Sequence, residues 1–362
     1  MYILIIIVIF SLVYYKYNNL FTEITTTKIY SMGTGLDKSP YHNFGQLVQN
    51  NVSYEMEVKI SEGSIENILK IENNELDFAL CQEEIAFDAV SKLGAFANKE
   101  FKNINFVCGI YFEFMHFIVK NKKQVSIQIN TVDDLRKSNN YKIGIGPKNS
   151  GSYNNFFLIS KLFNLVPISL EEKSAKNTVY YVTGTYNELF NQFVNDELDG
   201  LFIVSSPNNI YIKNLVKNDD VTFLDISDNV LLTDLFSQYF YKKQIDLSNY
   251  YTEIIKQDTI GTLASRAILI CNKNVEQPIV AETIRNVFLL QNIINPYDDY
   301  TPIEMAFCRN AFTLHNGAKQ YLKSIGLVSG DTQYSYDLNF YAENVVKNYW
   351  THDKIGNKLF SI

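Results

Sequence analysis

Hydrophobic and polar residues alternate along the chain with two different periods, and the period changes repeatedly after residue 28. Apolar residues at every second position predict strands, whereas apolar residues three or four positions apart predict helices. In the first part of the chain the pattern predicts strands at 29–32, 54–60 and 78–81 and helices at 41–50, 64–72 and 83–91. Strands that alternate with helices through short turns are typical of an α/β fold.

The alternation of strands and helices is interrupted at residues 105–120, where strands are predicted at 105–111 and 115–120 without a helix between them. We interpret this change as the point where the chain leaves one lobe for another. The alternation resumes with helices at 131–137 and 186–195 and strands at 141–145, 200–204 and 221–225. Near the end, a strand at 267–271 precedes a helix at 278–294 that has one apolar face.

Two segments of similar sequence indicate that the two lobes are built alike. Residues 73–80 (NNELDFAL) and 195–202 (NDELDGLF) each combine a helix end, a Leu-Asp corner and a buried strand. Predicted serine-capped helices at Ser64 and Ser150 add a second pair of matching features.

Residues 141–163 join a strand to a helix through a turn at 146–152 that is rich in glycine and hydroxyl groups. A strand that turns directly into a helix leaves the first N–H groups of that helix unpaired, at the positive end of the helix dipole. Such an end can hold a carboxylate or another small anion. The alternative is an ordinary cap, in which Ser150 or Ser152 accepts hydrogen bonds from its own helix.

The first residues form an apolar run from Tyr2 to Val13, interrupted only by Ser11. This length suits the core of a signal peptide and is short of the roughly 20 residues that span a bilayer. Two features of signal peptides are missing, since no Lys or Arg precedes the run and no small-residue cleavage site follows it. On the length and apolar character of the run, we interpret residues 1–17 as an export signal or an uncleaved anchor. A buried core strand is the alternative. Residues 18–27 are predicted to be a tether, and residues 331–362 an accessory C-terminal extension.

Charge and cysteine usage exclude several classes of function. The net charge is −7 and no run of basic residues occurs, so nucleic acid is not an expected partner. The four cysteines (Cys81, Cys108, Cys271 and Cys308) are widely spaced, and the four histidines are scattered. We therefore predict no metal site and interpret the cysteines as buried thiols, with a disulfide left open.

No motif for a cofactor or a catalytic group is complete. The loop at Gly33 and Gly35 follows a strand, but the third glycine of a dinucleotide loop would fall at Lys38. Neither a Walker A motif nor a nucleophile elbow occurs. The carboxylates of Asp77 and Asp199 are interpreted as corner caps. The sequence thus predicts a protein without a cofactor that is not an enzyme.

Six short motifs occur in the order that is found in one family. They are Gly33-Thr34-Gly35 with Tyr41 and Gly45, Gly63-Ser64-Ile65-Glu66-Asn67, Gln82 with Glu84, Gly146-Pro147 with Ser150-Gly151-Ser152, Asp196 to Gly200 with Pro207, and His315 with Gly317-Ala318. With these motifs the chain resembles the TAXI class of solute-binding proteins, the extracytoplasmic receptors of TRAP transporters. Leu36, Ser39 and Glu62 depart from the glycines that are usual in that family.

The resemblance implies a two-lobed α/β fold of periplasmic-binding-protein type II, with a central cleft and a hinge. Lobe 1 is expected to comprise residues 28–120 and 262–330, and lobe 2 residues 121–261. The implied function is to clamp a small carboxylate or a glutamate-like amino acid between the lobes and to deliver it to a TRAP-type permease. The implied location is outside the cytoplasm, either secreted or anchored to the membrane by the N-terminal segment.

The resemblance also implies which residues line the cleft and bind an anionic or zwitterionic solute. They are Gly33, Thr34, Gly35, Tyr41, Ser64, Asn67, Gln82, Ser150, Gly151 and Ser152. Two other functions stay open. One is a sensor that reports ligand occupancy to a partner without a transporter, and the other is an enzyme on the same fold.

Overall fold

The computed structural model describes residues 28–120, 129–138, 141–170, 172, 178–207, 209–218, 221–227, 240–251, 259–294 and 312–327. The predicted signal or anchor at 1–17, the tether at 18–27 and the C-terminal extension at 331–362 lie outside these residues.

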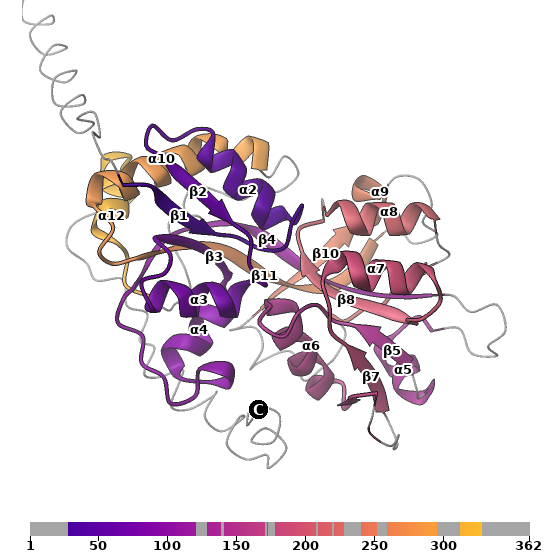
Figure 1. The fold of residues 1–362 in the computed structure, drawn as a ribbon. Helices are drawn as coiled ribbons and strands as arrows, with labels where there is room; N and C mark the ends of the chain where they lie inside the picture. Colours follow the sequence, from indigo (N-terminus) through magenta and orange to yellow (C-terminus); the bar gives the residue numbers. More distant parts are fainter. Residues whose placement is uncertain are drawn as a thin grey trace, which may run out of the picture.

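The described chain folds into two α/β lobes that lie side by side (Figure 1). Lobe 1 contains β1 (Tyr30–Gly33), α2 (Pro40–Gln49), β2 (Met56–Lys59), α3 (Ser64–Glu72), β3 (Phe78–Gln82), α4 (Glu83–Ser91), η2 (Gly94–Phe96), α10 (Gln277–Ile294) and α12 (Asn316–Ser324). Lobe 2 contains α5 (Val132–Ser138), β5 (Tyr141–Gly144), α6 (Gly151–Leu162), β6 (Val166–Ile168), β7 (Thr178–Val182), α7 (Tyr186–Val194), β8 (Gly200–Ser205), α8 (Ile210–Asn218), β9 (Val221–Phe223), β10 (Tyr241–Asp246) and α9 (Leu247–Tyr250).

Two long antiparallel strands, β4 (Ile104–Lys120) and β11 (Thr259–Asn272), run through both lobes. The described strands follow the order β2-β1-β3-β11-β4-β8-β5-β7-β6, so this strand pair lies between the parallel strands of lobe 1 and those of lobe 2. Near Phe114, β4 still pairs with Ala264 of β11 and begins to pair with Ser205 of β8. The structure confirms the two-lobed α/β fold expected from the sequence, while the exact domain limits stay a prediction.

The prediction of two separate strands at 105–111 and 115–120 was wrong. Residues Phe112, Glu113 and Phe114 continue the strand without a break, because β11 pairs with them along the whole stretch. Almost every residue of β4 is buried, since the strand is covered on both faces. Such a strand lacks the alternation of polar and apolar residues that shows a strand in the sequence.

The similar segments at 73–80 and 195–202 occupy equivalent places in the two lobes. Each ends in the strand next to the long pair, β3 beside β11 and β8 beside β4. Asp77 accepts a hydrogen bond from Ser31 N at 2.9 Å, and Asp199 accepts one from Lys142 N at 2.9 Å. Each aspartate thus fastens its own strand to the first strand of its lobe, which confirms the interpretation as corner caps.

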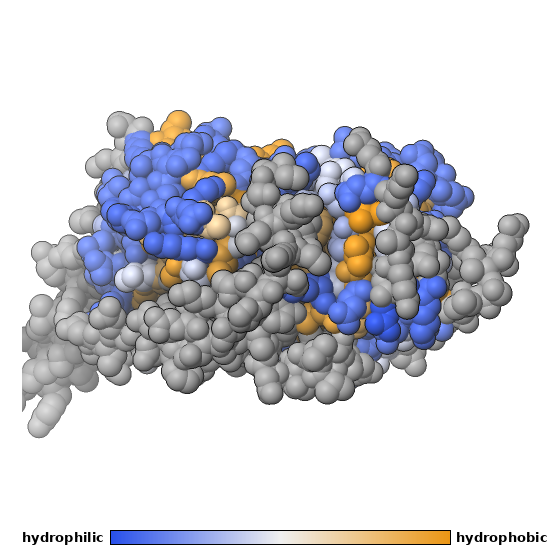
Figure 2. Space-filling model, turned by 90° about the horizontal axis from the view of Figure 1, so that it is seen from below, coloured by the Kyte–Doolittle hydropathy of each residue, from blue (hydrophilic) through white to orange (hydrophobic). Residues whose placement is uncertain are grey.

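The core comprises three apolar clusters. One extends through both lobes along one side of the sheet, and the other two lie on the opposite side, one in each lobe. Cys81, Cys108 and Cys271 are buried free thiols, as predicted, and Cys308 lies outside the described residues. On the face shown in Figure 2, hydrophilic residues cover most of the described surface of both lobes, with smaller apolar areas between them. Among the helices that the structure describes, none has the length and apolar character to cross a bilayer.

The corner caps lead to a test of stability. Asp77 also accepts from Ser31 Oγ at 3.1 Å and pairs with Lys28 Nζ at 2.7 Å. Because its removal leaves the N–H and the hydroxyl of Ser31 without their charged acceptor, we expect Asp77→Ala to lower the free energy of unfolding by about 2 kcal/mol, measured by urea denaturation. Asp37→Ala, on an exposed loop carboxylate, is the control and should change stability by less than about 0.5 kcal/mol. Equal effects of the two substitutions would contradict the assignment.

Candidate functional site

Several helices of both lobes begin at the gap between the lobes, where the preceding strands end. In lobe 1, Ser39 caps α2 by accepting from His42 N at 3.2 Å. In lobe 2, Ser150 caps α6 by accepting from Tyr153 N at 3.1 Å and donates to Pro147 O at 2.7 Å. The alternative interpretation of Ser150 as an ordinary cap is therefore correct for its hydroxyl group. The cap nevertheless stands at the wall of a cavity.

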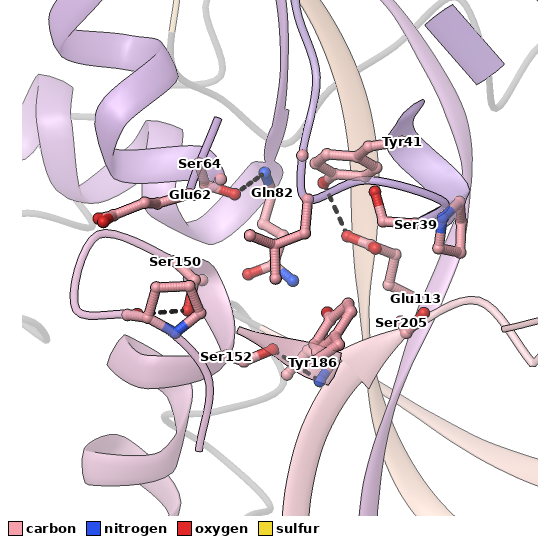
Figure 3. A pocket seen from close by; sticks show the side chains of 17 residues that line it. Ser39, Tyr41, Glu62, Ser64, Gln82, Glu113, Ser150, Ser152, Tyr186 and Ser205 are labelled. Carbon is pink, nitrogen blue, oxygen red and sulfur yellow. Dashed lines mark hydrogen bonds between the residues drawn. The ribbon is translucent and has the colours of Figure 1, made fainter. Parts of the chain in front are cut away.

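The cavity lies between the two lobes and has a volume of about 40 Å³. Lobe 1 contributes the loop before α2, the start of α3, Gln82 and Glu113 of β4. Lobe 2 contributes the start of α6, Tyr186 at the start of α7, and Ser205 at the end of β8 (Figure 3). A volume of this size holds about three water molecules. The space between the lobes is thus small, and both lobes contribute polar side chains to its wall.

Seven of the ten residues predicted to bind the solute line this cavity. They are Gly35, Tyr41, Ser64, Gln82, Ser150, Gly151 and Ser152. The hydroxyl groups of Ser64 and Ser152 accept backbone hydrogen bonds, from Gln82 N at 3.1 Å and from Val204 N at 2.9 Å. The predicted cap at Ser64 was wrong, because Gly63 is the N-cap of α3 and the Ser64 hydroxyl bonds to the neighbouring strand instead. Direct contact of these residues with a solute stays a prediction.

The other three predicted residues, Gly33, Thr34 and Asn67, do not line the cavity. The Thr34 hydroxyl donates to Lys59 O at 2.9 Å. The Asn67 amide is fully buried and donates to Thr34 O at 2.6 Å and to Leu80 O at 2.7 Å. These bonds join the ends of three neighbouring strands and hold the loop that forms the lobe 1 wall. Both side chains have a structural role in this arrangement.

The start of α3 is occupied by a loop of lobe 2, which the sequence did not predict. The backbone carbonyl of Asn149 accepts from Ile65 N at 3.1 Å and from Glu66 N at 3.4 Å. The Asn149 amide donates to Glu62 Oε2 at 2.7 Å. A Cβ atom on Gly63, whose φ is +132°, would meet Ser150 Cα at 3.3 Å. The first N–H groups of α3 therefore hold the lobes together, and we refer to these contacts of Asn149 as the rim latch.

A second polar contact between the lobes lies deeper. The amide of Asn155 on α6 donates to Glu84 Oε1 at 2.8 Å and to Gln82 Oε1 at 3.1 Å. The other oxygen of Glu84 accepts from the Ser265 hydroxyl. Burial raises the pKa of Glu84 to about 7. Gly151 leaves room for the Gln82 side chain, because a Cβ atom at this position would lie 1.7 Å from Gln82 Oε1 and would displace it.

Glu113 is the main residue of the cavity that the sequence analysis missed. It is 4% exposed, and its Oε2 accepts from the Tyr41 hydroxyl at 2.7 Å (Figure 3). Burial raises its pKa to about 8. The signal in the sequence was a single charged residue inside the apolar run 110–119, where a buried strand provides no solvent for a carboxylate.

Among the described residues, acidic side chains line the cavity and basic side chains do not. Glu62 and Glu113 are among its lining residues, and none of the residues that line it is Lys, Arg or His. In the described part of the chain, no group of three or more His, Cys, Asp or Glu residues is placed to hold a metal ion. Positive potential at the cavity comes from the helix N-termini, whose dipoles favour an anion there.

Comparisons with solved structures give distant similarities. The chain is similar to XAC2383 from Xanthomonas citri bound to chloride ion, with 8% identity and a TM-score of 0.43 over 88% of this chain and 99% of that one. It is similar to the substrate-binding protein of an amino acid ABC transporter, with 11% identity and a TM-score of 0.40 over 74% and 94%. It is also similar to the GluR0 ligand-binding core in complex with L-glutamate, with 10% identity and a TM-score of 0.42 over 75% and 96%.

No curated protein sequence matches the chain. The sequence profile of the NMT1-like family, in contrast, matches residues 22–326, which include both lobes and all residues of the cavity. The chain therefore belongs to the NMT1-like family.

Proposed function

We propose that this protein is an extracytoplasmic solute-binding protein of the TAXI class, which closes its two lobes around a small carboxylate or amino acid and delivers it to a TRAP-type permease. The observation that carries the proposal is the cavity between the lobes, which is lined by hydroxyl, amide and carboxyl side chains and has helix N-termini of both lobes at its wall. Residues 1–17 would export the chain or anchor it to the membrane. The protein would bind its solute without converting it.

The geometry supports binding by closure. Lobe 1 and lobe 2 each provide only part of the cavity wall, so an open form has two half-sites and a closed form has one complete site. A solute that contacts both halves binds the closed form more tightly and shifts the population toward it. A hundredfold preference for the closed form corresponds to about 3 kcal/mol.

Backbone N–H groups at the cavity can bind an anion although no arginine is among the described residues that line it. Gly151 and Ser152 form the first turn of α6, and their N–H groups have no hydrogen-bond partner among the described residues. The first N–H groups of any helix lack a partner within the helix, because no helical carbonyl precedes them. A carboxylate at this position is stabilised by about 0.3–1 kcal/mol at an exposed helix end and by more where the site is buried.

The first test is stabilisation by candidate solutes. We expect at least one small amino acid or carboxylate to raise the melting temperature of the protein by several degrees, because a ligand at 100 times its Kd stabilises by about 2.7 kcal/mol. Differential scanning fluorimetry against a panel of amino acids and mono- and dicarboxylates measures this. Sodium chloride at matched ionic strength is the control. If no member of the panel raises the melting temperature above that control, the proposal is wrong.

The rim latch leads to a second prediction. Asn149→Ala removes the bond to Glu62 across the cleft and leaves the backbone bonds to α3. Because an exposed bond of this kind is worth about 0.5–1 kcal/mol, we expect solute affinity to fall roughly two- to fivefold, measured by titration calorimetry. Asn73→Ala is the matched control, since Asn73 donates to Glu75 at 3.1 Å within lobe 1. An unchanged affinity for Asn149→Ala would show that the latch does not contribute to closure.

Stability should also depend on pH through Glu84. Its pKa in the folded state is raised from 4.5 to about 7, so the folded state binds protons more strongly than the unfolded state between these values. The contribution of Glu84 to stability therefore falls as pH rises from about 4.5 to about 7, by up to about 3 kcal/mol. His116 acts in the opposite direction, because burial lowers its pKa to about 4 and the folded state loses stability as pH falls.

The test is thus the difference between the protein and its Glu84→Gln variant, measured by urea denaturation across this pH range. The variant, which does not titrate at this position, should gain stability relative to the unaltered protein as pH rises. Glu62→Gln, on the rim of the cavity, should not reproduce this gain. A constant difference between the protein and Glu84→Gln at all pH values would contradict the prediction.

A further inference from the structure

We propose that the protein binds its anionic solute together with one proton, and that the Glu113 carboxyl group holds this proton and donates a hydrogen bond to the solute. The inference rests on the proposed function and adds a regulation of the same site by pH. The proton comes from the solvent, and no bond of the solute breaks.

The first observation is the burial of Glu113 at the wall of the cavity. The residue lies on β4, lines the cavity and is 4% exposed (Figure 3). The Tyr41 hydroxyl donates to its Oε2 at 2.7 Å, and the Gln82 side chain makes a second hydrogen bond. Both partners are neutral side chains. Because removal from water penalises the charged form of a carboxyl group, this position favours the protonated acid.

The second observation is another buried carboxyl group close by. Glu84 is 2% exposed and is linked to Glu113 through two amide side chains. The Asn155 amide donates to Glu84 Oε1 at 2.8 Å and to Gln82 Oε1 at 3.1 Å, and Gln82 in turn bonds to Glu113. Like charges so close together disfavour ionisation of both groups. The pair therefore keeps a proton at a pH at which an isolated glutamate has lost its own.

The other titratable groups around Glu113 do not supply a positive charge. Titratable side chains from α2, β3, α4, β4 and α7 interact with it electrostatically; they are Tyr41, Cys81, Glu84, Tyr111 and Tyr186. Burial raises the pKa of the three tyrosines and of the cysteine, so these four groups are neutral near pH 7. The proton that balances a charge here is thus held by a glutamate.

The buried arginine of β11 faces away from Glu113. In the β4–β11 pair, Glu113 is opposite Ser265, and Phe112 is opposite Arg266. Since successive residues of a strand point to opposite faces, Arg266 lies on the other face of the sheet from Glu113. There its Nε lies 3.8 Å from Glu83 Oε2. Arg266 therefore does not lie beside a solute in the cavity.

The third observation is the set of groups that an anion meets in the cavity. Of the described lining residues, Glu62 and Glu113 are acidic and none is Lys, Arg or His. An ionised Glu113 repels a bound carboxylate, whereas a protonated Glu113 offers it an O–H donor. Gly151 and Ser152, at the start of α6, line the same cavity and offer backbone N–H groups. One carboxylate oxygen can accept from this helix start and the other from Glu113.

The pKa of the group sets the pH range of the effect. Burial raises the pKa of Glu113 to about 8 and that of Glu84 to about 7. Because the complex contains the protonated Glu113, affinity is complete below the pKa of the free protein and is lost above it. Near pH 7 most of the protein already carries the proton. Above about pH 8 each bound solute must bring one from the solvent, so affinity falls about tenfold per pH unit.

The experiment measures affinity and proton uptake together. The full-length protein is titrated calorimetrically with acetate, succinate and glutarate between about pH 6.5 and about pH 9.5, where these anions keep their charge because carboxylic acids titrate near pH 4–5. We expect the affinity of each anion that binds to fall about thirtyfold over this range. At about pH 9, titrations in Tris and in borate, which differ in ionisation enthalpy, should show uptake of about one proton per solute.

Substitutions then assign the proton to Glu113. Glu113→Gln keeps an oxygen that accepts from Tyr41 and an N–H group that can donate to the solute, but it does not titrate. Its affinity should therefore change by less than about twofold over the same pH range. Glu282→Gln is the matched control, since Glu282 is also a buried carboxyl group of lobe 1, 5% exposed, and accepts from the Ser53 hydroxyl at 2.8 Å away from the cavity. It should keep the full pH dependence.

The outcomes separate the inference from the proposed function. If an anion binds with an affinity that does not depend on pH, or without proton uptake at about pH 9, the inference is overturned and the proposed function stands. If none of the three anions binds at any pH, the inference falls, and the earlier panel of solutes decides the proposed function. If Glu84→Gln removes the pH dependence and Glu113→Gln keeps it, the proton does not belong to Glu113.

Discussion

The backbone pairing of β4 with β11 is the constraint on which the rest of the structure depends. These strands belong to both lobes, and the hydrogen bonds between them join the lobes through continuous sheet. The same pairing brings Glu113 of β4 to the junction, at the wall of the cavity.

The parallel strands on either side of this pair explain why helix N-termini lie at the cleft. Their carboxyl ends lead into helices whose N-termini meet at the gap between the lobes, as is usual in open α/β sheets. The helix starts of the two lobes differ in their hydrogen bonding. The start of α3 binds the loop of lobe 2 through Asn149, whereas the N–H groups of Gly151 and Ser152 at the start of α6 have no partner among the residues that the structure describes.

Local features of the fold were predictable from the sequence because they depend on residues close together in the chain. The βα alternation, the Leu-Asp corners at Asp77 and Asp199 and the cap at Ser150 are all of this kind. Seven of the seventeen residues that line the cavity could also be predicted, since they lie in motifs that resemble those of a known family. The single long strand β4 could not, because a strand buried on both faces shows no alternation.

The sequence by itself thus determined the order of strands and helices, the two similar lobes and the loops that meet at the cleft. Only the tertiary structure decided which groups line the cavity. Tyr41 and Glu113 are 72 residues apart, and Asn149 and Glu62 are 87 apart, so their contacts depend on strand register and lobe closure. Thr34 and Asn67 bond to backbone behind the wall for the same reason. The spacing of hydrophobic residues along the chain carries no information about contacts between such distant residues.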